Sequence, residues 1–310
     1  MKSERFQHRH IGINAEEEKI MLAKIGVKSL DELIDQTIPQ NIRLQSGLNL
    51  PEALSEHEYA EEMALMASKN RICASYIGMG WYDTVCPAPI FRNVFENPVW
   101  YTSYTPYQAE ISQGRLEALM NFQTMVSELT GLPLSNCSLL DEATAGAEAA
   151  AMMHALRSRD QVKNGANKLF VDKNIFPQTL AVINTRAVPQ GIEVVVGDYK
   201  VFDINSEFFG VVIQYPNSNG SVEDYAAFTE KVHAAGCKVA VATDLMALTL
   251  LVPPGEWGAD IAFGSSQRFG IPMFYGGPSA GFFATKEENK RNVPGRIIGV
   301  STVSYTHLTL

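Results

Sequence analysis

The sequence has no apolar run of the roughly 18 residues that a membrane-spanning helix needs, so no membrane partner is indicated. It has four cysteines in 310 residues, and none form a C-x-x-C pair, which argues against a zinc site or a disulfide framework. Lys and Arg number 25 against 34 Asp and Glu, a net charge of -9. This acidic balance also argues against nucleic acid as a partner.

The sequence also lacks the patterns of a metal site and of a serine hydrolase. The six histidines are not clustered at metal-ligand spacing, so we predict no metal site. There is no G-x-S-x-G turn, which argues against a Ser/His/Asp hydrolase. The N-terminus, MKSERFQHRHIG, has no apolar signal-peptide core, and we therefore expect a cytoplasmic protein.

The apolar content is ample for a core. Hydrophobic residues make up 46% of the chain, enough for one large domain with an extension. Residues 1–70 have the features of a helical N-terminal extension, because Asn14, Ser29 and Ser55 each precede acidic residues in the manner of a helix cap. Residues 71–115 are rich in Tyr, Trp, Pro and Gly, which predicts a long irregular segment of the functional or partner-binding kind.

Short apolar strands then alternate with helices. We predict helices at 115–129, 141–157, 177–188 and 221–235, the last capped by Ser221, and strands at 168–171, 192–196, 209–215, 238–243, 260–263 and 279–285. This alternation predicts an α/β domain whose mostly parallel sheet is covered on both faces. Ligands of such sheets bind beyond the carboxyl ends of the strands, which directs attention to Asp172, Asp244 and residues 265–267.

Asp244 follows the apolar strand VAVAT and allows two interpretations. In enzymes that use pyridoxal phosphate (PLP), an Asp at this place pairs with the pyridine nitrogen of the cofactor. A strand-end Asp can also simply cap the following turn, and the sequence slightly favours that role.

Other requirements of PLP chemistry are poorly met. The small residues of 138–153 could admit a phosphate at a helix N-terminus, but the charges of Asp141 and Glu142 would repel it, so self-capping is the stronger interpretation. No lysine lies between Lys238 and Lys286, and neither Gln267 nor Arg268 can form a Schiff base. The sequence therefore predicts a degenerate cofactor pocket.

The most distinctive segment is 100–125, in which tyrosines crowd around Pro106. Tyrosine combines apolar area with a hydrogen-bonding tip and serves ligand sites and interfaces alike. We expect a site or interface here, in preference to an aromatic loop packed under the next helix. The candidates for lining a partner's substrate pocket are Tyr104, Tyr107, Gln108, Glu110, Ser112 and Gln113.

Several long segments resemble one family. RHIGINAEEEKIML (9–22), residues 76–125, LLDEATAGAEAA (139–150) and residues 263–285 are similar to the first half of glycine decarboxylases, the P-proteins of the glycine cleavage system. The similarity runs from about Arg9 to Ser301 and implies an aminotransferase-like large domain of PLP-dependent fold type I. The second half of that family carries a His-Lys pair whose lysine binds PLP; alignment puts this pair at Ser266 and Gln267. The degenerate pocket implied for this half comprises Asp141, Thr144, Glu148, Asp244, Ser266, Gln267 and Arg268.

The resemblance also implies a role. The family decarboxylates glycine and transfers the aminomethyl group to the lipoyl arm of the H-protein, with PLP on the catalytic half and none on this one. The implied partners are that catalytic half, a second copy in a homodimer, the H-protein and glycine. An alternative is a non-catalytic scaffold subunit of a two-subunit glycine decarboxylase.

The resemblance gives a domain division. The extension (1–70) precedes the non-catalytic large domain (71–301), and residues 302–310 do not match the family, so we expect a truncated or frame-shifted end. The sequence downstream of codon 301 would distinguish the first half of a longer chain from a separate subunit.

Overall fold

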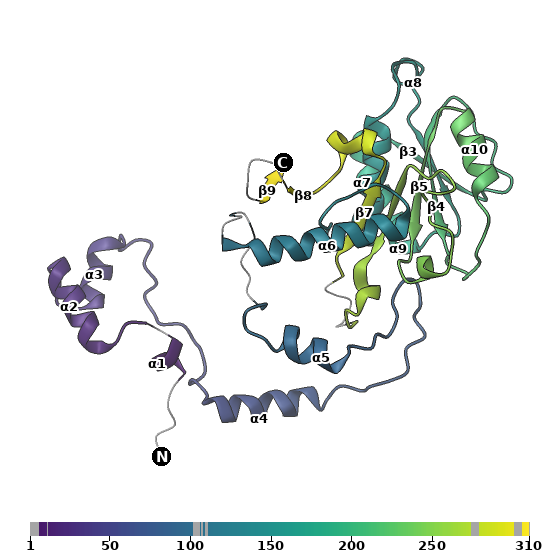
Figure 1. Ribbon diagram of the computed structural model, residues 1–310. Helices are drawn as coiled ribbons and strands as arrows, with labels where there is room; N and C mark the ends of the chain where they lie inside the picture. The colour runs from purple at the N-terminus through teal and green to yellow at the C-terminus, as the bar shows by residue number, and fades with distance from the viewer. Residues whose placement is uncertain are drawn as a thin grey trace. The chain divides into compact units, whose positions relative to one another are not determined.

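The computed structural model describes residues 6–10, 12–101, 106, 108, 111–273, 279–300 and 306–309. Contacts within the chain divide it into two compact units, Met1–Ala74 and Ser75–Leu310. We call the second unit the sheet domain. Figure 1 shows the first unit in purple to violet-blue and the sheet domain in blue, teal, green and yellow.

The described residues of the first unit form the helices α1 (Gln7–His10), α2 (Ala15–Ile25), α3 (Leu30–Thr37) and α4 (Glu56–Ala67). The predicted caps are present, because the Asn14 side chain accepts from the N–H groups of residues 16 and 17, and Ser55 forms a capping box with Glu58. The apolar side chains of α4 are not buried within the unit, since Leu65 is 68% exposed and Met66 is 52% exposed.

The sheet domain is built on a seven-stranded mixed sheet in the order β1-β7-β6-β5-β4-β2-β3. The central strands run parallel, and β7 and β1 pair antiparallel at one edge. The strands are β1 (Leu134–Ser135), β2 (Lys168–Asp172), β3 (Glu193–Gly197), β4 (Phe208–Tyr215), β5 (Lys238–Thr243), β6 (Ile261–Ser265) and β7 (Gly281–Thr285). This arrangement confirms the predicted α/β sheet.

Helices cover both faces of this sheet, as predicted. α7 (Glu142–Ala155) and α9 (Pro177–Ala187) pack on one face, and α6 (Gln113–Thr130) and α10 (Ala226–Ala234) pack on the other. Successive side chains of one strand point to opposite faces of the sheet. Ala240 and Ala242 of β5 pack in the core beneath α7, whereas Val239 and Val241 pack in the core beneath α6. The apolar runs in the sequence thus reflect burial on both faces.

Short elements complete the domain: α5 (Ala88–Ile90), the π-helix η1 (Phe91–Phe95), α8 (Arg159–Lys163), the 3₁₀ turns η3 (Val188–Gln190), η4 (Ala247–Thr249), η5 (Ser266–Phe269) and η7 (Glu287–Asn292), and the pair β8 (Ile297–Val300) and β9 (Thr306–Thr309). Within the described ranges, no helix is both long and apolar enough to cross a bilayer.

The helix expected at 221–235 was placed wrongly at its start. It begins at Ala226, and Ser221 does not cap it. The backbone N–H of Ser221 instead donates to Asn217 Oδ1 at 3.0 Å, which folds residues 217–221 into a turn directly after β4. Asparagine makes such local side-chain bonds in competition with helix formation.

Candidate functional site

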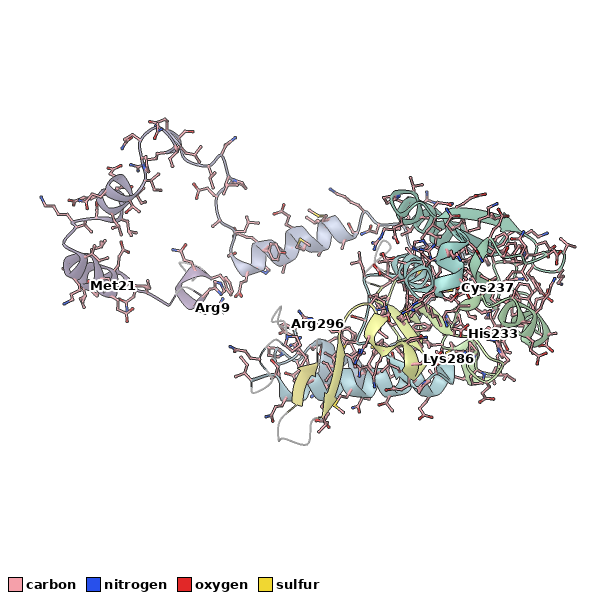
Figure 2. The ribbon with its side chains drawn as sticks, turned by 90° about the horizontal axis from the view of Figure 1, so that it is seen from above. Arg9, Met21, His233, Cys237, Lys286 and Arg296 are labelled. Atoms are coloured by element: carbon pink, nitrogen blue, oxygen red, sulfur yellow. The ribbon has the colours of Figure 1, made fainter. Side chains whose placement is uncertain are left out.

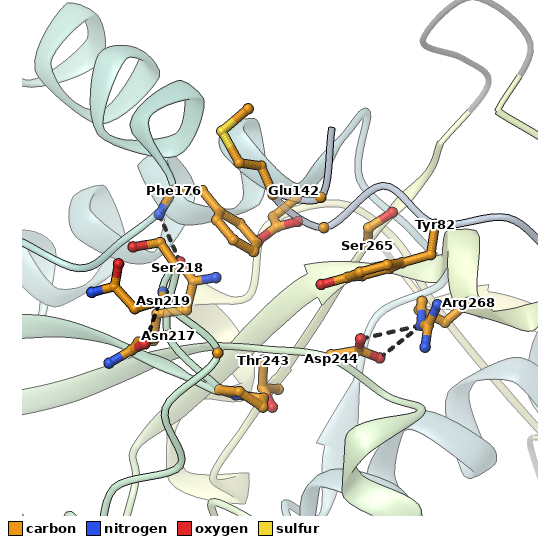
Figure 3. Close-up of a pocket in the computed structure, with 16 residues that line it drawn as sticks. Tyr82, Glu142, Phe176, Asn217, Ser218, Asn219, Thr243, Asp244, Ser265 and Arg268 are labelled. Carbon is orange, nitrogen blue, oxygen red and sulfur yellow. Dashed lines mark hydrogen bonds and ion pairs between the residues drawn. The ribbon is translucent and has the colours of Figure 1, made fainter. Parts of the chain in front are cut away.

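A cavity of about 320 Å³ lies where β4, β5 and β6 end, beside the first turn of α7. Figure 3 shows the side chains around it. Parallel strands leave such a hollow at their carboxyl edge, where the connections diverge. Its lining comprises Gly78, Met79, Gly80, Tyr82, Glu142, Phe176, Gln214, Pro216, Asn217, Ser218, Asn219, Gly220, Thr243, Asp244, Ser265 and Arg268.

Asp244 is not free to receive a ligand. Arg268 Nε lies 3.2 Å from Asp244 Oδ1 and 3.1 Å from Oδ2, and the N–H of Met246 donates to Oδ1 at 2.8 Å. The guanidinium carbon of Arg268 also lies 4.3 Å from the centre of the Tyr82 ring. Asp244 therefore caps its turn, as slightly favoured above, and also holds a cation supplied by the chain itself.

Gln267 lies outside this cavity although the resemblance aligns it with the Schiff-base lysine. Its side chain is fully buried, and Nε2 donates to the carbonyls of Tyr82 at 2.7 Å and Ile271 at 2.8 Å. Its Oε1 has no hydrogen-bond partner in the described part of the chain. The neighbouring Ser266 donates its hydroxyl proton to the carbonyl of Ala280 at 2.7 Å. Both residues hold backbone segments together.

The start of α7 corrects one expectation. Asp141 caps the helix by accepting from the N–H of Thr144 at 2.7 Å, as predicted. Glu142 does not act as a second fixed charge, because burial, with further contributions from Asp244 and Asp141, raises the pKa of its carboxyl to about 8. At neutral pH Glu142 is therefore mostly protonated, so electrostatic repulsion of a phosphate by Glu142 was wrongly expected.

Most of the residues predicted to form the degenerate pocket do not line the cavity. Only Asp244 and Arg268 of the seven degenerate-pocket residues line the cavity, while Asp141 lines an adjoining hollow with Glu142. Glu148 points to Arg186 of α9 at 2.6 Å. Asp172 is buried and accepts from the backbone of Asn174 and Tyr199, so it organises its own strand end.

The tyrosine-rich segment is described only in part. Tyr104, Tyr107 and Glu110 lie outside the described residues. Gln108 and Gln113 are exposed, whereas Ser112 is buried at the start of α6, where its carbonyl accepts from the N–H of Leu116 at 2.9 Å. None of these three lines the cavity.

Sequence reasoning missed much of the cavity wall. The turn at 217–220 and the ring of Phe176 line it, as does the segment 78–82. The turn could have been found, because PNSNG directly follows a buried strand, and strand ends form the ligand edge. Residues 78–82 belong to the irregular segment expected to be functional, but their contact with the strand ends is distant in sequence and could not be placed.

The side chains present do not fit PLP. The position aligned with the Schiff-base lysine holds a buried amide, and the carboxylate that would pair with the ring nitrogen is already paired with Arg268. In the described ranges, no cluster of His, Cys, Asp or Glu is suited to a metal ion either. The cavity can admit a small polar molecule but lacks the groups for covalent chemistry on an aldehyde.

We therefore expect the chain not to form a Schiff base with PLP. Titration should give no aldimine absorbance, and borohydride reduction followed by peptide mapping should give no stoichiometric label on one lysine. Gln267→Lys alone should not rescue activity, because Arg268 still occupies Asp244, the carboxylate that would pair with the ring nitrogen. Specific labelling of a single lysine in the unaltered chain would contradict the degenerate-pocket interpretation.

Comparison with known proteins gives one family. The family described as "Glycine cleavage system P-protein" matches residues 8–307, so the match ends within the 302–310 tail. The chain is 66% identical over 308 residues to a glycine dehydrogenase (decarboxylating) of Bacteroides thetaiotaomicron, and 56% identical over 296 residues to that of Nostoc punctiforme. These alignments cover 99% and 96% of this chain but 32% and 30% of the relatives. The chain thus spans about a third of their length.

Solved structures agree. A crystal structure of glycine decarboxylase (P-protein) of the glycine cleavage system, in inhibitor-bound form, is similar with a TM-score of 0.84 and 33% identity, over 96% of this chain and 68% of that one. The sphingosine-1-phosphate lyase of Burkholderia pseudomallei shares only the fold, with a TM-score of 0.55 and 10% identity over 87% of this chain and 67% of that one. These likenesses confirm the expected fold of PLP-dependent enzymes.

Proposed function

Because this chain belongs to the glycine cleavage system P-protein family, we propose that it supplies the N-terminal, non-catalytic part of a glycine dehydrogenase (decarboxylating). What supports the proposal is the buried side chain of Gln267, which the resemblance aligns with the cofactor lysine, in a chain 66% identical to such an enzyme. A half that cannot hold PLP contributes walls, orientation and docking surface instead of bond-making groups.

The wider reaction is part of the same proposal. A catalytic half would hold PLP, which would supply the electron sink for glycine decarboxylation, and the lipoyl arm of the H-protein would accept the aminomethyl group. This chain would pair with that catalytic half, and two such assemblies would form a homodimer. None of these steps needs a reactive side chain on the sheet domain described above.

A chimera tests the proposal. We expect residues 1–300 of this chain to replace the matching part of the Bacteroides thetaiotaomicron enzyme with glycine–bicarbonate exchange retained within about tenfold, because the chain is 66% identical to the part that it replaces. The isolated chain should give no exchange above buffer. Exchange is measured with H-protein present, at matched enzyme concentration.

The control is the same chimera with the catalytic lysine of the relative's own second half replaced by alanine. It should abolish exchange while the chimera stays folded. A chimera that folds and binds PLP but gives no exchange would contradict the assignment. Full exchange by the isolated chain would contradict the non-catalytic role.

We further propose that the 104–113 segment lines the catalytic half's pocket, and the dense polar and aromatic groups of that segment support this. In the chimera, Gln108→Ala and Tyr107→Phe should lower turnover by about tenfold or more, with little change in melting temperature. Packing residues would behave in the opposite way, with a stability loss and unchanged turnover. Glu117→Gln, at an exposed residue of α6 outside the segment, is the control and should leave both turnover and melting temperature nearly unchanged.

A further inference from the structure

Arg268 is a planar cation that contacts both a carboxylate and an aromatic ring. Its guanidinium is a flat, permanently charged group. Its Nε–H donates to Asp244 Oδ1 at 3.2 Å, and Nε lies 3.1 Å from Oδ2. The guanidinium carbon lies 4.3 Å from the centre of the Tyr82 ring. Figure 3 shows Arg268, Asp244 and Tyr82 gathered at one end of the cavity.

A protonated pyridine ring in a fold of this kind makes the same kind of contact: a flat cation whose N–H meets the strand-end carboxylate. We propose that the Arg268 guanidinium is a built-in substitute for such a ring, and that Asp244 and Tyr82 form a site selective for flat cations. The site would accept guanidinium or pyridinium-type ions once the arginine side chain is removed. This inference rests on the sheet domain alone and holds whether or not the proposed activity does.

The chain fixes Tyr82 in a way that suits this role. Gln267, the neighbour of Arg268, donates to the Tyr82 carbonyl at 2.7 Å, and the Thr84 hydroxyl donates to the carbonyl of Gly270 at 3.4 Å. One turn, η5, thus holds the Tyr82 backbone through Gln267 and its ring through Arg268. The Gln267 bond to the Tyr82 backbone does not depend on Arg268, so it remains when the arginine side chain is removed.

The charges of the cavity lining also favour a bound cation. Asp244 and Glu142 both line it, and Asp244 contributes to the raised pKa of the Glu142 carboxyl. Arg268 is the cationic side chain in the described lining. Removal of the Arg268 side chain leaves the Asp244 carboxylate and the Tyr82 ring without their cation. A small flat cation can take the place of the missing guanidinium.

Chemical rescue tests the inference in the whole chain. Arg268→Ala should lower the melting temperature by about 4–8 °C, and about 20 mM guanidinium hydrochloride should recover at least a third of that loss by binding the folded state. The same concentration of urea, flat but neutral, should recover none, and neither should sodium chloride. At this concentration the denaturing effect of guanidinium on the unaltered chain is roughly 1 °C or less.

The controls separate the site from general effects. Arg159→Ala removes an exposed arginine of α8 and should show no guanidinium-dependent gain. Adding Asp244→Asn to Arg268→Ala should abolish the recovery. Equal recovery with sodium chloride, or an unchanged melting temperature for Arg268→Ala, would overturn the inference.

A second variant covers the case in which Arg268→Ala does not fold. Arg268→Lys keeps the positive charge and most of the side-chain volume but lacks the planar guanidinium group. It should melt below the unaltered chain and fail to respond to guanidinium, because its own side chain still fills the space. A lysine variant as stable as the unaltered chain would show that flatness has no part in the site.

Discussion

Replacement of Glu142 by glutamine should raise the melting temperature of the sheet domain at pH 8 by about 5–12 °C, and change it little at pH 4.5. Burial, with Asp244 and Asp141 nearby, raises the pKa of the Glu142 carboxyl from its ordinary 4.5 to about 8. Glutamine is neutral at every pH and has nearly the same shape as the protonated acid. It therefore keeps the packing and removes the penalty of ionisation.

The direction follows from proton linkage. Below pH 4.5 both the folded and the unfolded chain hold the proton, so Glu142 carries no penalty. Between pH 4.5 and 8 the unfolded chain releases the proton while the folded chain retains it, and stability falls as pH rises through this window. The shift corresponds to about 2–5 kcal/mol at pH 8.

Thermal unfolding of both proteins from pH 4.5 to 8.5 gives the difference directly. Glu230→Gln, at an exposed position of α10, is the matched control and should give a small difference that does not vary with pH. A Glu142→Gln difference that is equally flat across the range would show that this carboxyl ionises normally in the folded chain.

Asp260→Asn is expected to destabilise the sheet domain by about 3–5 kcal/mol at pH 7, because it leaves the partly buried Lys286 ammonium without its carboxylate. Asp260 is 3% exposed at the edge where β5 and β6 begin, opposite the cavity. Its Oδ1 lies 2.7 Å from Lys286 Nζ, and its Oδ2 lies 2.8 Å from both His233 Nε2 and the backbone nitrogen of Val239. Figure 2 labels Lys286 and His233 close together on this domain.

The effect should depend on pH in the opposite sense to that of Glu142. Burial alone would raise the pKa of the Asp260 carboxyl, but the bonds from Lys286, Val239 and His233 outweigh burial and hold it below its ordinary 3.8. The stabilisation is present above that value and is lost as pH falls through the lower folded pKa. Urea unfolding at pH 7 and pH 3 should therefore show a large and then a reduced penalty for Asp260→Asn.

Asp203→Asn is the control for this experiment. Its side chain is 96% exposed and pairs with Lys231 at 3.4 Å, so its loss should cost about 0.5 kcal/mol or less. Equal penalties for the two variants would mean that the contacts of Asp260 add nothing beyond those of a surface ion pair.

Much of the fold follows from local sequence. The strands near 168–172, 208–215 and 238–243 are runs of apolar, mostly β-branched or aromatic residues, and such runs form strands buried on both faces wherever helices can cover them. The caps at Asn14 and Asp141 depend on partners two or three residues away. The helix before Gly236 was predicted to begin too early because the Asn217 turn, which uses Ser221, competes with it.

The absence of a cofactor lysine was also determined by the sequence alone, because it concerns which residues exist and not where they lie. Only the tertiary structure decided what replaced it. Arg268 reaches Asp244 across 24 residues, and Gln267 reaches Tyr82 across 185. The proton on Glu142 depends likewise on burial and on Asp244, which is brought near by a different strand. Partners and pKa values are set by whatever lies within a few ångströms in the folded chain, and sequence order does not encode that distance.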